Sequence, residues 1–129
     1  SHIMDQVEKH RCEEILAFYE SGKEPLTQWR FRQTVLCLGP VAFVPYPFEM
    51  FCEIAIAQQA GSPFPYTLCL SNCGGAELYL PTREEIPFGG YEVQQFKQAK
   101  VFALTEDAEH RIVAENQRLL AQLFSKRRR

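Results

Sequence analysis

The sequence predicts an α/β or α+β fold with a small mixed sheet of three to four strands. Three observations predict it: an apolar β-hairpin over residues 29–44, a strand-helix-strand unit over 41–70, and a long amphipathic helix over 105–124. The chain has 129 residues, of which 46% are hydrophobic and 12% aromatic. This is enough apolar material for a packed core.

The N-terminal part predicts a first helix. Residues 1–4 (Ser-His-Ile-Met) resemble the remnant of an expression vector, so residues 5–129 are taken as a single domain or a domain fragment. From Asp5 to Glu20 apolar and charged side chains recur at helical spacing, and the segment 21–25 (Ser-Gly-Lys-Glu-Pro) ends the pattern.

The central part predicts the hairpin and a β-α-β unit. Residues 29–38 are rich in aromatic and β-favouring side chains, and Gly39-Pro40 turns the chain before the apolar run 41–44. Pro47 suits the first turn of a helix, which predicts a helix over 47–60. Its expected core stripe is Phe48, Phe51, Cys52, Ala55 and Ile56. The apolar run 66–70 is then a strand parallel to 41–44.

The last third predicts loops and one long helix. Residues 72–75 form a loop, residues 77–80 a brief extended piece, and residues 81–91 a long turn region. Thr105 is the expected N-cap of a helix that runs to Phe124 and docks on the sheet. The expected buried stripe of this helix is Ala108, Ile112, Asn116, Leu119, Leu120 and Leu123.

Composition excludes several function classes. Fourteen basic and sixteen acidic side chains give a net charge of −2, which offers no broad surface for nucleic acid. No apolar run approaches the ~20 residues of a membrane span. Five cysteines without a Cys-x-x-Cys pair argue against a disulfide framework and a zinc knuckle, and favour reduced thiols in the cytoplasm.

Two segments are placed to form a binding crevice. In open α/β sheets ligands collect beyond the carboxyl ends of parallel strands, and residues 45–49 and 71–75 both follow such ends. On spacing alone, Glu49 is explained more simply as a carboxylate at a helix N-terminus. Tyr79 alone is explained as a packed strand aromatic.

Three motifs in this region resemble the neutral/alkaline non-lysosomal ceramidase family. They are Glu-Met-Phe-Cys-Glu-Ile at 49–54, Tyr-Leu-Pro-Thr-Arg-Glu-Glu at 79–85 and Gly-Gly-Tyr-Glu-Val at 89–93, in the family's order and spacing. Residues 62–66 also look like the family's entry to its second strand. The resemblance runs from about Arg32 to Phe124 and covers the C-terminal portion of the catalytic domain.

The resemblance implies a zinc-dependent amidohydrolase that cleaves an N-acyl amide to fatty acid and amine. It implies a metal held by two histidines from earlier in the catalytic domain together with Glu49 and Tyr79, where zinc activates a water for attack on the amide carbonyl. The supporting or substrate-loop positions that it implies are Glu53, Gly74, Gly75, Thr82, Tyr91 and Glu92.

The chain departs from the family at functional positions. Pro47-Phe48 replaces the family's Pro-Gly, and residues 74–76 (Gly-Gly-Ala) replace its Asn-Gly-Tyr. His10 and His110 match no family ligand, so we expect half a metal site, no tightly bound zinc and an inactive fragment. The missing N-terminal part of the domain or a partner chain would complete it, and a homo-oligomer is a further option. The alternative is a degenerate, non-catalytic binding or assembly module.

Overall fold

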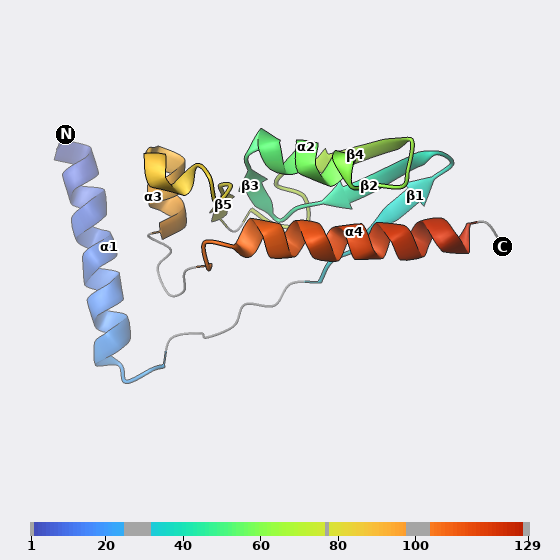
Figure 1. Cartoon of the computed structure of the whole chain (residues 1–129). Helices are drawn as coiled ribbons and strands as arrows, with labels where there is room; N and C mark the ends of the chain where they lie inside the picture. The colour runs from blue at the N-terminus through green and yellow to red at the C-terminus, as the bar shows by residue number, and fades with distance from the viewer. Residues whose placement is uncertain (1, 25–31, 77, 98–103, 128–129) are drawn as a thin grey trace.

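The computed structural model describes residues 2–24, 32–76, 78–97 and 104–127 of the chain. The elements in order are α1 (His2–Glu20), β1 (Leu36–Leu38), β2 (Val41–Pro45), β3 (Phe48–Met50), α2 (Cys52–Ala60), β4 (Tyr66–Leu70), β5 (Leu78–Leu80), the 3-10 helix η1 (Ile86–Phe88), α3 (Tyr91–Lys97) and α4 (Ala108–Lys126) (Figure 1). Helices are mixed with small sheets and followed by a long C-terminal helix, so the predicted fold class is confirmed.

The main sheet has the strand order β1-β2-β4. β1 and β2 are antiparallel across the Gly39-Pro40 turn, where Gly39 has a φ of 55°. β2 and β4 are parallel, with α2 between them in the chain. The predicted hairpin and β-α-β unit are therefore confirmed, although residues 32–35 are not part of the first strand and residues 29–31 lie outside the described ranges.

The prediction of a helix from residue 47 is wrong for its first turn. Residues 48–50 form the strand β3, which pairs in parallel with β5. The backbone here is held on both sides: the Asn72 N–H donates to the Phe48 carbonyl at 2.8 Å, and the Phe51 N–H donates to the Leu80 carbonyl at 3.0 Å. These hydrogen bonds keep the chain extended, so α2 begins only at Cys52.

The predicted core stripe of α2 also needs correction. Its buried residues are Ile54 and Gln58, whereas Cys52 and Ile56 are exposed. Gln58 is tolerated in the core because its side-chain oxygen accepts a hydrogen bond from the Tyr46 hydroxyl at 2.7 Å. An apolar pattern in the sequence cannot reveal a polar residue that is buried through such a pair.

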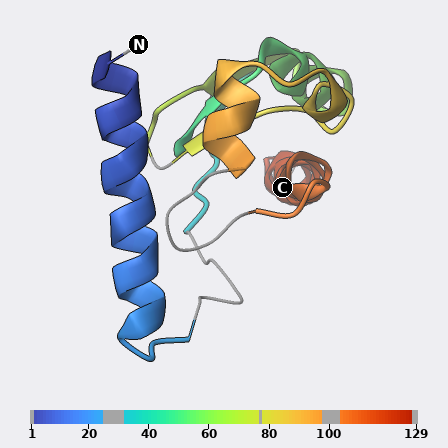
Figure 2. The same cartoon turned by 90° about the vertical axis from the view of Figure 1, so that its left-hand side faces the viewer.

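The hydrophobic core lies between the main sheet and the two helices α2 and α4. Ala42 and Val44 of β2 pack in one cluster with Ile54 of α2 and with Val113 and Leu120 of α4. Figure 2, which looks along α4, shows this helix beside α2 and the strands. The docking of the C-terminal helix is therefore confirmed. Of its predicted stripe, Ala108, Asn116 and Leu120 are buried, whereas Ile112, Leu119 and Leu123 are only partly buried. Val113, which the prediction left out, is also buried.

Both terminal helices have different starts from those predicted. α4 starts at Ala108 rather than Thr105, because residues 105–107 form a turn in which the Thr105 carbonyl accepts the Ala108 N–H at 2.9 Å. α1 starts already at His2 and stands apart from the sheets (Figures 1 and 2). Within the described ranges, no helix is long and apolar enough to cross a membrane.

The region predicted as turns up to residue 91 ends in the helix α3 instead. Tyr91 and Glu92, expected in a loop, form the first turn of this helix. Val93 and Phe96 are buried against Ile86 of η1 in a second small core. This packing stabilises a helix that is too short to be stable alone.

Phe48 gives a direct test of how β3 packs in the main core. Its side chain is fully buried in the main core, so Phe48→Ala is expected to lower the free energy of unfolding by about 3–5 kcal/mol. Phe88 is 82% exposed, so Phe88→Ala serves as the matched control and should change it by less than about 0.5 kcal/mol. Urea denaturation followed by circular dichroism measures both, and equal effects would contradict the burial of Phe48.

Candidate functional site

The strand pair β3–β5 brings Glu49 and Tyr79 together. Glu49 lies directly opposite Tyr79 in the register of the two parallel strands. Neighbouring strands are about 4.8 Å apart, and side chains of paired residues leave the sheet on the same face. Glu49 is exposed and Tyr79 is half-buried, so a carboxylate and a phenol stand side by side at an accessible position.

Tyr91 and Glu92 reach this pair from α3. The Tyr91 ring meets the Tyr79 ring edge to face, with centroids 6.0 Å apart and an interplanar angle of 79°. Glu92 contributes a second negative charge to the surroundings of Tyr79. Two of the predicted supporting residues are thus next to the predicted metal-facing pair, although a helix and not a loop places them.

The environment raises the pKa of Tyr79. The largest cause is partial removal of the phenol from water, followed by its hydrogen bond with Glu49 and the negative charge of that carboxylate. Tyr91 and Glu92 raise the pKa further. Each of these causes disfavours the phenolate relative to the phenol.

The loop after β4 supports β3 from the other side. The Ser71 hydroxyl donates to the Phe48 carbonyl at 3.0 Å and accepts from the Met50 N–H at 3.2 Å. The Cys73 N–H donates to the Tyr46 carbonyl at 2.9 Å. Residues 45–49 and 71–75 therefore lie side by side beyond the carboxyl ends of β2 and β4.

The remaining predicted supporting residues lie elsewhere or have a structural role. Thr82 is buried, and its hydroxyl and carbonyl both accept the Glu85 N–H, which closes the turn before η1. Glu53 is exposed in the first turn of α2. Gly74 and Gly75 lie in the loop after β4, where the φ of 83° at Gly74 favours glycine.

One residue that positions this region escaped the sequence analysis. Glu109 of α4 is 7% exposed, and its carboxylate accepts the Arg83 N–H at 3.3 Å and contacts His110 Nδ1 at 2.5 Å. It connects the start of α4 to the turn that follows β5. The only signal in the sequence was an acidic residue in the first turn of a helix. Such residues are usually exposed, so this signal does not predict a buried carboxylate.

The residues present fit only part of a zinc site. Catalytic zinc usually has three protein ligands, with nitrogen or sulfur prominent among them, whereas Glu49 and Tyr79 supply two oxygens. Among the residues that the structure describes, no group of three or more His, Cys, Asp or Glu side chains can hold a metal ion. His10 pairs with Glu14 on α1, and His110 contacts Glu109 on α4.

Comparison with known proteins gives no assignment. No family model, no curated protein and no solved structure matches the chain. Function is therefore inferred from the residues and from their geometry.

The Glu49–Tyr79 interaction predicts a measurable change in the titration of Tyr79. Glu49→Gln removes a negative charge beside the phenol, so the pKa of Tyr79 should fall toward its ordinary value. NMR of 13C-labelled tyrosine over a pH series measures this, and Glu53→Gln on α2 is the matched control. An unchanged pKa in Glu49→Gln would contradict the pairing.

Proposed function

We propose that this chain is the C-terminal part of a zinc-dependent N-acyl amidohydrolase domain similar to the neutral/alkaline ceramidases. The observation that carries the proposal is the alignment of Glu49 with Tyr79 on adjacent parallel strands. These are the two positions that match the family's metal ligands, and they come from separate motifs. The pairing of β3 with β5 supports their use on one metal ion.

In this proposal the chain contributes two oxygen ligands and their supports. Glu49 supplies a carboxylate, and the Tyr91 ring fixes the orientation of the Tyr79 phenol. The nitrogen ligands come from histidines in the preceding part of the catalytic domain or in a partner chain. Because the pKa of Tyr79 is raised and a metal ligand must be deprotonated, metal binding at this pair depends on those other ligands.

A second candidate function is a degenerate module of the same fold that binds or assembles without catalysis. Two observations favour it. Residues 74–76 (Gly-Gly-Ala) lack the amide and the aromatic ring of the family's Asn-Gly-Tyr. Phe48 replaces a glycine and is fully buried in the core directly before Glu49. The two functions differ in whether a completed site holds zinc and releases fatty acid.

The chain alone is expected neither to bind zinc tightly nor to release fatty acid from a fluorogenic N-acyl amine. Two oxygen donors are too few, and Tyr79 would have to lose a proton from a group whose pKa is raised. Isothermal titration with zinc and a fluorescence assay measure the two properties.

The controls for this experiment are two double variants. Glu49→Ala with Tyr79→Phe removes the candidate pair, whereas Glu84→Ala with Tyr66→Phe removes an exposed carboxylate and an exposed phenol elsewhere. Sub-micromolar zinc binding that disappears only in the first double variant would show that the chain assembles a zinc site by itself. The fragment hypothesis would then be wrong.

Completion of the site separates the two candidate functions. The experiment adds the histidine-bearing part of a ceramidase-type catalytic domain to this chain. The complex with the wild-type chain is expected to retain zinc, and the complex with Glu49→Gln is expected to lose it. Elemental analysis after gel filtration measures zinc per complex. Retained zinc without fatty-acid release would favour the degenerate module, and a complex that forms without zinc would contradict the metal assignment of Glu49.

A further inference from the structure

We propose that a second copy of this chain docks on the uncovered face of the β1-β2-β4 sheet, with the two sheets packed face to face. One face of this sheet packs against α2 and α4 through Ala42 and Val44. Because side chains alternate along a strand, the intervening residues point away from that core. We call these residues the open face: Leu36, Leu38, Val41, Phe43, Tyr66, Leu68 and Leu70.

The open face is continuous across all three strands. The register places Leu38, Val41 and Tyr66 in one row, and a second row contains Leu36, Phe43 and Leu68. The residues on its outer strands are accessible: Leu38 is 75% exposed, Tyr66 63%, Leu36 61%, Leu68 46% and Leu70 37%. Sheets with parallel strands are normally covered on both faces, yet both helices in contact with this sheet's core, among the described elements, lie on the other side.

The size of the open face agrees with a dimer interface. At these exposed fractions it leaves about 500 Å² of apolar side-chain surface accessible, near the upper limit for a monomer. Two copies packed face to face would bury roughly 1,000 Å², which is about the minimum for a specific interface. A two-fold axis would satisfy both copies at once, because each presents the same surface.

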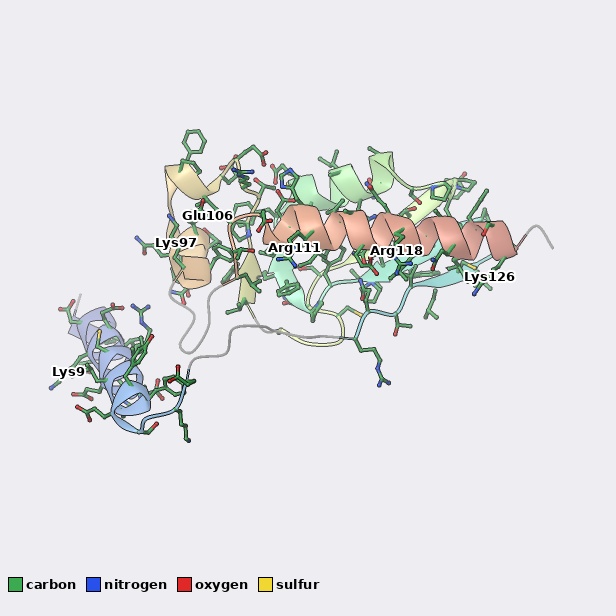
Figure 3. The ribbon with its side chains drawn as sticks, turned by 60° about the horizontal axis from the view of Figure 1, so that its bottom comes forward. Lys9, Lys97, Glu106, Arg111, Arg118 and Lys126 are labelled. Atoms are coloured by element: carbon green, nitrogen blue, oxygen red, sulfur yellow. The ribbon has the colours of Figure 1, made fainter. Side chains whose placement is uncertain are left out.

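The charge distribution favours an identical partner. The open face contains no charged side chain, so two copies can meet without burying like charges. The charges of the helical layer lie elsewhere: Arg111, Arg118 and Lys126 follow one another along the exposed side of α4 (Figure 3). A strongly charged partner would find no complementary group on the open face.

Docking through the face is favoured over addition of a strand at the β4 edge. The outward-facing Thr67 carbonyl of β4 accepts a hydrogen bond from the Gln59 side chain at 3.0 Å. This contact occupies part of the edge that an added strand would need. The two sheets would instead stack about 10 Å apart with interdigitated side chains.

Sedimentation equilibrium of the full chain at roughly 100 µM tests the proposal. The wild type is expected at about twice the 14.9 kDa of one chain. Leu68→Lys, in the middle row of the open face, should sediment as a monomer, because a dimer would bury its ammonium group. Ile56→Lys changes a residue that is 63% exposed on α2, so it is the matched control and should remain dimeric.

Circular dichroism shows whether each variant is folded, so that loss of the dimer is not confused with unfolding. If Leu68→Lys fails to fold, Leu38→Lys at the exposed end of β1 provides the same test. A monomeric wild type, or a dimer that survives a folded Leu68→Lys, would overturn the proposal. Binding of a different partner chain or of phosphatidylcholine vesicles through the open face of a monomeric wild type would overturn it as well.

Discussion

The alternation of side chains along β2 is the constraint on which the rest of the structure depends. Ala42, Val44, Tyr46 and Phe48 are all fully buried, and Pro47, at the bend between β2 and β3, is buried with them. The pairing with β4 continues past the end of β2, because the Tyr46 N–H donates to the Leu70 carbonyl at 2.8 Å. A slip of one residue would turn every side chain of β2 over, so this register is strongly fixed.

Polar contacts beneath the sheet hold the end of the central strand that leads to the candidate site. Gln58 is fully buried and accepts from Tyr46, which connects the strand to α2. Asn116 of α4 accepts from Gln33 at 2.8 Å, and the same Gln33 amide donates to the Pro45 carbonyl at 2.9 Å. Burial raises the pKa of Tyr46, so its hydroxyl remains a donor in this network. These contacts specify the geometry at the end of β2.

The elements that depend on local signals could be predicted from the sequence. The apolar runs around Gly39-Pro40 predicted the hairpin, and the wide stripe over 108–123 predicted α4. β3 escaped because three residues show no period, and because Pro47 fits a helix start equally well. Hydrogen bonds from Asn72 and to Leu80, both distant in the chain, decide its conformation. α3 escaped for a related reason, since packing on Ile86 and not helix propensity stabilises it.

The candidate site was predictable only in part. Spacing alone explained Glu49 as a carboxylate at a helix N-terminus. Only the resemblance of the motifs to the ceramidase family predicted that Glu49 and Tyr79 belong to one site. The approach of Tyr91 required α3, and the buried position of Glu109 required the turn after β5; neither element has a strong local pattern. Where tertiary hydrogen bonds and not periodicity fix the backbone, residue types indicate possible chemistry but not which groups meet.

The open face and the candidate site belong to different sheets. The chain bends at Pro47, which is buried, so the alternation of side chains along β2 does not carry over to Glu49. Glu49 lies on β3, which pairs with β5 in a separate two-stranded sheet, whereas the open face lies on the β1-β2-β4 sheet. Assembly through the open face and completion of a metal site at Glu49 and Tyr79 are therefore separate proposals, and the failure of one leaves the other standing.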